Sequence, residues 1–403
     1  MTNEEPGGYL KHSRRFWKFQ SVSESKWKDW KWQLQNRLQN GSRLTDYFPN
    51  ASPVEIQNFK NYAGRFTLGL TPYALSLLEL DRDLNPINSD PIWRQVRYFD
   101  AEAVAGDYAY DGTSTNWELP SEFPTRILQH KYPDRAIIRI VNHCLGYCSF
   151  CYLTARILDK ESKKSLAFSS ESWKKTLDYL RAHEEIRDVL ISGGDPLALG
   201  NSKLDQIFED LSGIDSIKSV RLNTRALSFN PFRLNRELAE IFKRHRLNSL
   251  EIHLVHPREI TAEFDEALAH FDECGYRPRI LWRSPLLKGI NDSIDVLEDM
   301  LIKLYQRRVV PYYLFHAAPF TVARSSYATS IRKGIDLLLN LRRRIPGPAF
   351  PRYTLFHPGG KQDIPLELGG TPHFQFTRNS DGDPIVRFWN WRGEEVTYPD
   401  VLD

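Results

Sequence analysis

Three of the four cysteines in this chain lie within eight residues, in the segment Cys144-Leu-Gly-Tyr-Cys148-Ser-Phe-Cys151. Three thiolates can hold three corners of a [4Fe–4S] cube and leave the fourth iron open to a ligand. An open iron can bind and reduce that ligand, whereas a cube held by four cysteines mainly passes electrons. A zinc site is the alternative, but it needs a fourth ligand at similar range, and His143 is poorly placed beside Cys144. The segment therefore favours an iron–sulfur cluster.

A second segment, Ser192-Gly193-Gly194-Asp195-Pro196, directly follows a short apolar run. Glycines lack a Cβ atom, so their backbone can approach a bound molecule closely and offer it N–H and C=O groups. Taken alone, the segment is better explained as a structural turn. A cysteine triad after the preceding predicted strand favours a turn that contacts a ligand.

A third segment ends in Pro358-Gly-Gly-Lys361. A lysine on a glycine-rich turn can reach a bound aldehyde and form a Schiff base. The segment is not a phosphate-binding P-loop, because Gln362 follows the lysine and the first glycine of that motif is absent. For the isolated string, an ordinary surface lysine is the simplest explanation.

A fourth segment, Lys131-Tyr132-Pro-Asp-Arg135, precedes the first predicted barrel strand. Its cations and phenol suit a phosphate group. A solvated, charged turn explains the same residues equally well when they are considered alone.

The whole chain has the composition of a globular protein, with 403 residues, 26% charged and 41% hydrophobic. The net charge of +3 suggests neither a nucleic-acid nor a membrane partner. No apolar run approaches the ~20 residues that span a bilayer, and the polar start is unlike a secretory signal. The cysteines do not form a disulfide framework, and Cys274 stands alone. We expect a cytoplasmic protein, since a reducing compartment protects an oxygen-sensitive cluster.

Three regions are predicted: an N-terminal helical region and connector (1–130), a barrel (131–320) and a C-terminal segment (321–403). The first region is expected to be helical from about Ser23 to Leu84. In the barrel, apolar strands alternate with amphipathic helices, which implies a parallel sheet with right-handed crossovers. The predicted strands are Ala136–Val141, Asp188–Ser192, Ser219–Asn223, Leu250–Val255, Arg279–Ser284 and Val309–His316. The predicted helices are Ser170–His183, Leu204–Leu211, Leu234–Arg244, Ile260–Cys274 and Ile294–Gln306.

Six such units predict an α/β fold, a partial (β/α)6 TIM-like barrel. Active sites of such folds form where the strands end. Candidate side chains follow five of the six strands, and we expect all of them at one mouth: Cys144, Gly193-Gly194-Asp195, Arg225, His256 and His316. In the C-terminal segment, Phe374–Thr377 and Pro384–Trp389 predict a short hairpin.

The C-x3-C-x2-C spacing is that of radical S-adenosylmethionine (SAM) enzymes, and the segments together resemble their lysine 2,3-aminomutase family. The resemblance spans roughly residues 22 to 370. It rests on motifs that occur in the family's order: Trp27-Lys-Asp-Trp-Lys-Trp-Gln-Leu-Gln-Asn36, Thr71-Pro-Tyr-Ala74, Tyr132-Pro-Asp-Arg135, the cysteine triad, Leu190–Leu197, His256-Pro-Arg-Glu-Ile-Thr261, Leu286–Asp292 and a shortened Pro358-Gly-Gly-Lys361.

The resemblance implies three cofactors. A [4Fe–4S] cluster on Cys144, Cys148 and Cys151 would reduce SAM to a 5′-deoxyadenosyl radical, and pyridoxal 5′-phosphate (PLP) on Lys361 would carry the substrate amine. The implied SAM contacts are Ser192, Gly193, Gly194, Asp195 and Arg225, and the implied PLP-phosphate contacts are Lys131, Tyr132 and Arg135. The cofactors supply the reactivity that moves nitrogen between adjacent carbons, and the protein supplies positioning.

The departures from the family pattern concern the substrate. Leu153 stands where the family has an arginine for the substrate carboxylate, and Ala318 and Phe356 stand where it has two aspartates for the distal amine of lysine. Without those carboxylates a buried ammonium lacks its paired charge, so free lysine is not the expected substrate. We expect no zinc, since the cysteine-bearing zinc segment of some relatives is absent. Three arginines could supply the missing carboxylate contact: Arg156, Arg283 and Arg324.

The predicted function is therefore a radical SAM, PLP-dependent 2,3-aminomutase, an isomerase acting on an amino acid or a similar amine other than lysine. One alternative is an enzyme of the same fold that acts on a protein-borne residue or without amino migration. A second alternative, from another class, is a non-catalytic [4Fe–4S] protein. The expected partners are a small-molecule substrate and an electron donor such as flavodoxin or ferredoxin, and a homo-oligomer is compatible with the sequence.

Overall fold

The structure is a computed structural model that describes residues 4–5, 9–10, 15–99, 118–160, 168–318, 321, 324–366, 374–390 and 392–402. The chain divides into two compact units. Unit 1 comprises Met1–Ala101, Pro120–Leu254 and Arg258–Ile280, and unit 2 comprises Glu102–Leu119, Val255–Pro257 and Leu281–Asp403. Within the described ranges, no helix is long and apolar enough to cross a membrane. The predicted region boundaries at residues 130 and 320 stay a prediction.

The central sheet has the strand order β5-β6-β7-β8-β9-β10-β11-β12-β13. Its strands are β5 Leu128–Tyr132, β6 Arg135–Val141, β7 Asp188–Gly193, β8 Ser219–Thr224, β9 Ser249–His253, β10 Arg279–Leu286, β11 Val310–His316, β12 Arg352–His357 and β13 Gly360–Asp363. In unit 1, β6, β7, β8 and β9 pair in parallel, and in unit 2 β10, β11 and β12 do so. All six predicted strands are present, and the α/β partial-barrel fold is confirmed. Strands β12 and β13 were not predicted.

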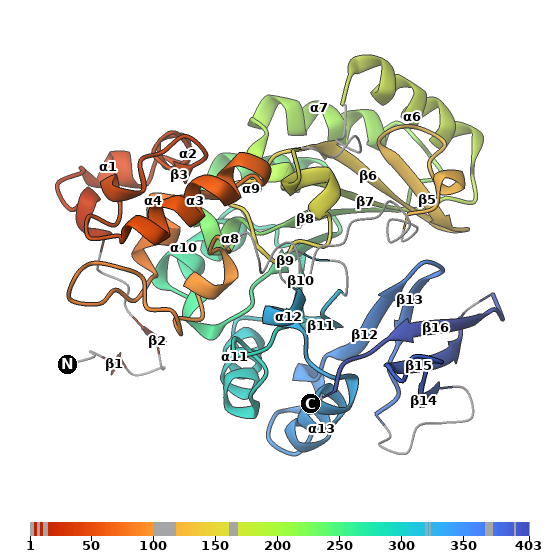
Figure 1. Cartoon of the computed structure of the whole chain (residues 1–403). Helices are drawn as coiled ribbons and strands as arrows, with labels where there is room; N and C mark the ends of the chain where they lie inside the picture. The colour runs from red at the N-terminus through yellow and green to blue at the C-terminus, as the bar shows by residue number, and fades with distance from the viewer. Residues whose placement is uncertain are drawn as a thin grey trace. The chain divides into compact units, whose positions relative to one another are not determined.

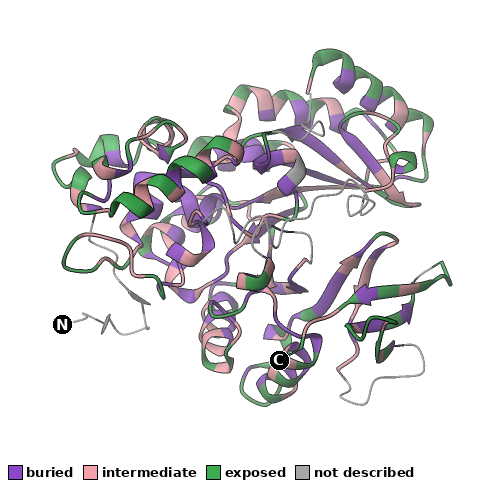
Figure 2. Cartoon of the chain, in the orientation of Figure 1, coloured by how far each residue is buried: buried purple, intermediate pink, exposed green. Residues whose placement is uncertain are grey.

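Helices alternate with these strands. They are α6 Ser170–Ala182, α7 Asn201–Ser212, α8 Ala226–Phe229, α9 Arg236–Arg244, α10 Ala262–Glu273, α11 Ile294–Gln306, α12 Arg324–Tyr327 and α13 Ile331–Leu341. Of these, α6, α9, α10, α11 and α13 begin at a side-chain cap of the kind that the sequence favours. In α9, the Asn235 side chain accepts from the N–H of Leu238, and the helix buries Leu238 and Phe242. Figure 2 shows the same division in α6 and α7, with buried residues toward the strands and exposed ones outward.

The N-terminal region is helical but broken into short pieces (Figure 1). Its helices are α1 Glu24–Trp27, α2 Trp30–Gln35, α3 Pro53–Arg65 and α4 Pro72–Ser76, with the small strands β1 Glu4–Glu5, β2 Tyr9–Leu10, β3 Leu38–Gln39 and β4 Gly69–Leu70. Ser23, Asp29, Ser52 and Thr71 each cap a new helix, which is why a continuous helical stretch from Ser23 does not form. Trp27 is buried, in keeping with a packing role.

The C-terminal part of unit 2 is a three-stranded antiparallel sheet. Strands β14 Phe374–Arg378 and β15 Pro384–Trp389 form the predicted hairpin, with Asp381 and Gly382 in the turn. A third strand, β16 Glu395–Pro399, pairs with β15 and was not predicted.

Candidate functional site

The cysteine loop, residues 142–151, begins directly after β6 in unit 1 and is tied to distant parts of the unit by its backbone. Arg37 donates to the carbonyl of Cys144 at 2.9 Å, and the N–H of Tyr147 donates to Gly69 O at 3.0 Å. The N–H of Ser149 donates to Gln95 O at 2.9 Å. The loop therefore has a defined path although it lies between a strand and an irregular segment.

The predicted glycine turn lies against the start of this loop. The N–H of Gly194 donates to Val141 O at 2.7 Å, and the N–H of Asp195 donates to His143 O at 3.0 Å. A Cβ atom would lie 2.3 Å from Val141 O at Gly193 and 2.2 Å from His143 O at Gly194. Gly193 also has a φ of +130°. Only glycines allow this close approach, so the turn is required to bring β7 beside the cysteine loop.

Arg225, at the end of β8, joins the same cluster through a buried polar network. Its guanidinium donates to Cys148 Sγ at 2.6 Å and to a Glu259 carboxylate oxygen at 3.3 Å, and it also donates to Gln95 Oε1. Glu259 is 1% exposed and also accepts from Gln95 Nε2 at 3.1 Å. The charge of the arginine is thus compensated, and its direction toward the cysteine is fixed.

Asp195 and Ser192 are buried beside these residues. The Asp195 carboxylate accepts from the Thr224 hydroxyl at 2.8 Å and from the N–H groups of Arg225 at 2.8 Å and Leu197 at 3.0 Å. Burial raises the pKa of this carboxyl. These bonds join the ends of β7 and β8, which is a positioning role, and a direct contact of Asp195 or Ser192 with SAM stays a prediction.

The three cysteines are half-buried and close enough to influence one another. Burial raises the pKa of each thiol, to about 12 for Cys151, where the neighbouring Cys148 adds to the effect. For Cys148, the Arg225 guanidinium partly opposes the rise. Three thiols that disfavour their charged forms in a shared desolvated site need a cation to become thiolates together. This donor set fits the three corners of a [4Fe–4S] cluster.

Among the described residues, no group of three or more His, Cys, Asp or Glu side chains is arranged to hold one metal ion. The cysteines of a cube each bind a different iron, so their sulfurs are spaced more widely than the ligands of one ion.

The predicted phosphate contacts lie at the opposite end of β6. Tyr132 and Arg135 flank the β5–β6 turn and pair with each other, so they stand a strand length from Cys144. Arg135 donates to both oxygens of Asp134, at 2.8 and 2.7 Å, and Lys131 forms an ion pair with Glu122 at 3.0 Å. A phosphate would compete with these carboxylates for Arg135 and Lys131. The assignment of Lys131, Tyr132 and Arg135 to the PLP phosphate stays a prediction.

Lys361 lies in unit 2, on the edge strand β13, opposite Phe356 of β12. Its Nζ is 4.7 Å from the ring centroid of Tyr313, 5.4 Å from that of Phe315 and 5.8 Å from that of Phe356. The Phe315 and Phe356 rings stack with their centroids 4.4 Å apart. We call Tyr313, Phe315 and Phe356 the aromatic wall. Three rings within this range stabilise an ammonium.

His316 ends β11 but belongs to the other face of these strands, because successive strand residues alternate. Its Nδ1 is 3.0 Å from the Tyr353 hydroxyl. That hydroxyl packs on α13, where a Cβ at Gly334 would lie 2.0 Å from it. Burial lowers the pKa of His316 to about 3. The expectation that His316 joins the mouth is wrong, since its side chain belongs to the helix-covered side.

The three arginines proposed for a substrate carboxylate lie in different places. Arg156 in unit 1 stacks on the ring of Phe123, 4.9 Å from its centroid. Arg324 is close enough to His316 to lower its pKa. Only Arg283 shares a strand face with the aromatic wall, because it pairs with Tyr313 across β10 and β11.

Gln95 and Glu259 were not predicted as site residues, although they orient Arg225. Gln95 comes from the connector, whose sequence shows no signal for it. Glu259 belongs to the His256–Thr261 motif quoted above, and its place in a motif shared with the family was a usable signal.

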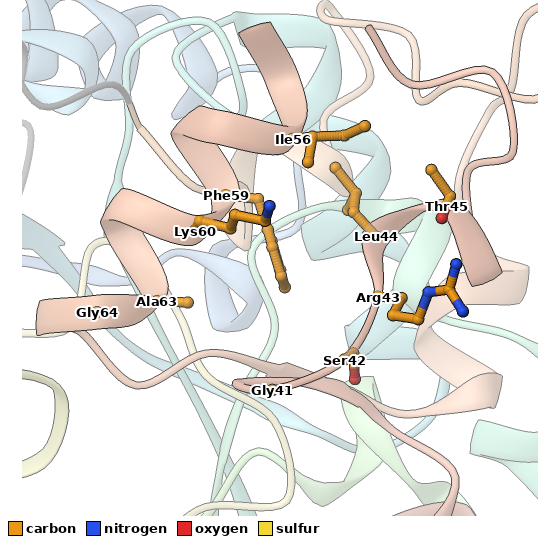
Figure 3. A pocket seen from close by; sticks show the side chains of 10 residues that line it. All are labelled: Gly41, Ser42, Arg43, Leu44, Thr45, Ile56, Phe59, Lys60, Ala63 and Gly64. Atoms are coloured by element: carbon orange, nitrogen blue, oxygen red, sulfur yellow. The ribbon is translucent and has the colours of Figure 1, made fainter. Parts of the chain in front are cut away.

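A hollow of ≈ 490 Å³ lies elsewhere in unit 1, between residues 41–45 and α3 (Figure 3). Arg43 and Lys60 are the charged residues that line it. It shares no residue with the cysteine loop or with β13.

Comparison with known proteins agrees with this geometry. Residues 138–298 match the family described as the Radical SAM superfamily, which places the chain in that class of enzyme. That superfamily implies a [4Fe–4S] cluster and SAM. The chain is 32% identical over 388 residues to a protein of Aquifex aeolicus (strain VF5) provisionally named an L-lysine 2,3-aminomutase, covering 96% of this chain and 98% of the relative.

Two further relatives cover most of the chain as well. The L-lysine 2,3-aminomutase of Clostridium subterminale is 29% identical, over 97% of this chain and 88% of the relative. The glutamate 2,3-aminomutase of Clostridioides difficile (strain 630) is 30% identical, over 94% of this chain and 84% of the relative. The chain belongs to the lysine 2,3-aminomutase family of radical SAM enzymes.

Proposed function

We propose that this chain is a PLP-dependent 2,3-aminomutase that moves an amino group between adjacent carbons of an amino acid other than free lysine. The observation that carries the proposal is the gathering of Cys144, Cys148 and Cys151 beside the Gly193-Gly194 turn and Arg225. The names of the relatives, which cover lysine and glutamate 2,3-aminomutases, support the reaction type.

In this proposal the chain's residues divide into three sets. Cys144, Cys148 and Cys151 hold the cluster, Ser192–Asp195 and Arg225 hold SAM, and Lys361 holds PLP with Lys131, Tyr132 and Arg135 at its phosphate. When bound, the cluster and SAM would supply a carbon-centred radical, and PLP would carry the substrate amine.

The surrounding protein limits side reactions in two ways. Leu145, between the first two cysteines, and Leu153, two residues after the third, are both buried, and in this proposal they reduce the access of water to the cluster position. Arg225 is held by Glu259 and Gln95, so its N–H groups stay directed at Cys148. Hydrogen bonds to cluster sulfurs tune the reduction potential.

In this proposal free lysine is not the substrate, because the positions at which the family has charged residues carry uncharged ones here. Leu153 is 6% exposed and offers no cation for a carboxylate, and Ala318 and Phe356 offer no carboxylate for a distal ammonium. An ammonium transferred from water without a paired charge costs several kcal/mol.

We also propose that the protein is cytoplasmic and that flavodoxin or ferredoxin is its electron donor.

The test is anaerobic reconstitution with iron, sulfide and PLP, followed by dithionite reduction in the presence of SAM. We expect 5′-deoxyadenosine and the conversion of a non-lysine amino acid to its β-isomer. Lys361→Ala should abolish the PLP absorbance band that borohydride fixes to the protein, whereas Lys333→Ala, at a partly exposed lysine of the same unit, should keep it. Lysine turnover at a normal enzyme rate would contradict the proposal.

A further inference from the structure

The strand face that carries Lys361 is lined by rings rather than by carboxylates. Tyr313 and Phe315 are two residues apart on β11, so both belong to one face. Thr354 pairs with Phe315, and Lys361 pairs with Phe356, which places Phe356 and Lys361 on that face as well. Tyr313 and Phe315 are 7% and 6% exposed, while Phe356 is half-buried. A molecule held at Lys361 therefore meets stacked aromatic surface.

The carboxylate beside Lys361 on β13 is paired with a cation of β12. Arg352 donates to Asp363 at 2.9 Å, and the other oxygen of Asp363 accepts from the Thr354 hydroxyl at 2.8 Å. Asp363 thus already accepts from two donors of the neighbouring strand β12. A substrate ammonium at the wall would compete with Arg352 for this carboxylate, in addition to the cost of its own desolvation.

A buried cation shares the same face. Arg283 is 4% exposed and lies in register with Tyr313 on the neighbouring strand. An amino-acid carboxylate is the group that a buried guanidinium recognises best, because its two oxygens match the fork of N–H donors. The face therefore combines a lysine, a buried guanidinium and an apolar surface.

We propose that the substrate is an α-amino acid with an uncharged apolar side chain, preferably aromatic, which packs on Tyr313, Phe315 and Phe356. This inference rests on the proposed function, since it assumes that PLP at Lys361 holds the substrate amine. Apolar contact is worth about 25 cal/mol per Å² of buried surface, and offset ring pairs contribute about 0.5–1.5 kcal/mol more. A substrate ammonium gains neither term, and the cation–π attraction that the rings offer is already made with the Lys361 amine.

The experiment is a binding titration of the PLP-reconstituted protein without SAM. L-Phenylalanine, L-leucine, L-lysine and L-glutamate are added separately, and the change in the absorbance band of lysine-bound PLP is followed. We expect phenylalanine to act at a concentration at least about tenfold lower than lysine or glutamate, with leucine between them. Lysine or glutamate acting at the lowest concentration, or no response to any of the four, would overturn the inference.

Two variants test whether the aromatic wall causes the preference for phenylalanine over lysine. The double variant Ala318→Asp/Phe356→Asp restores carboxylates at both positions and should reverse the ratio in favour of lysine. Phe376→Asp, a half-buried phenylalanine of β14 beneath Arg332, is the matched control and should leave the ratio unchanged. An unchanged ratio in the double variant that still attaches PLP would also overturn the inference.

This titration, together with the 5′-deoxyadenosine assay of the reduced protein, separates this inference from the proposed function. If the protein attaches no PLP at Lys361, the result contradicts both the proposed function and the inference. If PLP is attached and SAM is cleaved, but lysine is preferred, only the assignment of the substrate class falls.

Discussion

The cysteine loop of unit 1 and the Lys361 strand of unit 2 are held by opposite kinds of interaction. The cysteine loop is fixed by hydrogen bonds from residues far away in sequence, including Arg37, Gln95 and Arg225. Lys361 lies on an edge strand of four residues, and its amine is surrounded by rings.

This difference indicates which of the two regions tolerates amino-acid substitution better. A buried polar network tolerates little substitution, because each lost partner leaves another group unsatisfied. An apolar wall tolerates changes of shape more readily. We infer that the cysteine loop is constrained by chemistry common to the family. The strand face that carries Lys361 can instead be altered to accept substrates with different side chains.

The largest expected effect comes from removing a cluster ligand. Cys148→Ala should reduce bound iron and the formation of 5′-deoxyadenosine to background, because two thiolates cannot hold the cube. Cys274→Ala is the control, since Cys274 is buried at the end of α10 and its thiol donates to the backbone carbonyls of Phe271 and Tyr276 at 3.3 and 3.6 Å. Iron analysis and the cluster absorbance measure both variants. Full iron content in Cys148→Ala would refute the cluster assignment.

A methyl group at the glycine turn should have the next largest effect. In Gly194→Ala the new Cβ meets His143 O at 2.2 Å, so the cysteine loop must move. We expect the free energy of unfolding to fall by about 2–4 kcal/mol and the reconstituted iron content to fall with it. Gly200→Ala is the matched control, because nothing lies within 4 Å of its Cβ position. Equal urea midpoints for the two variants would show that the loop is not rigid.

Acid should destabilise unit 2 through His316. Its pKa is lowered by burial from 6.5 to about 3, so the unfolded chain binds a proton between these pH values and the folded chain does not. The stabilisation is therefore present above pH 6.5 and is lost as the pH falls toward 3, by roughly 2–3 kcal/mol between pH 7 and pH 4.5. Urea titrations between pH 7 and pH 4.5 should show this loss in the native chain.

His316→Gln should flatten that pH dependence, because glutamine keeps a hydrogen-bonding group toward Tyr353 but does not titrate. His183→Gln, at a histidine of side-chain exposure 36%, serves as the control and should leave the slope unchanged. A slope that persists in His316→Gln would assign the acid sensitivity to another group.

The smallest effect expected is that of Glu259→Gln. The amide keeps the shape of the side chain but removes the charge that compensates Arg225, so we expect a loss of about 1–3 kcal/mol. Glu266→Gln, which weakens an exposed pair with Lys28, should cost less than about 1 kcal/mol. A shift in the midpoint potential of the reconstituted cluster in Glu259→Gln alone would show that Arg225 tunes the cluster as well as the fold.

Much of the barrel could be predicted because its signals are local. The strand at Asp188 and the helix at Ile294 begin at their predicted residues, since apolar runs and caps such as Ser293 are encoded within a few positions. Strand β12 was missed because its sequence, Arg352–His357, mixes charged and aromatic residues and becomes a strand only through pairing with β11. The breaks between the N-terminal helices were also not predicted, although the four capping residues that mark them are present in the sequence.

The sequence by itself determined which chemistry is available: the cysteine spacing, the glycine turn and the lysine after it specify the residue types that can hold the cofactors. Only the tertiary structure decided how these groups are held and what surrounds them. Glu259 and Gln95 meet Arg225 across separate segments, His316 turns away from the expected mouth, and Phe356 joins Tyr313 and Phe315 in one wall. Pairing between strands fixes which side chains share a face, and that pairing is set by contacts distant in the chain.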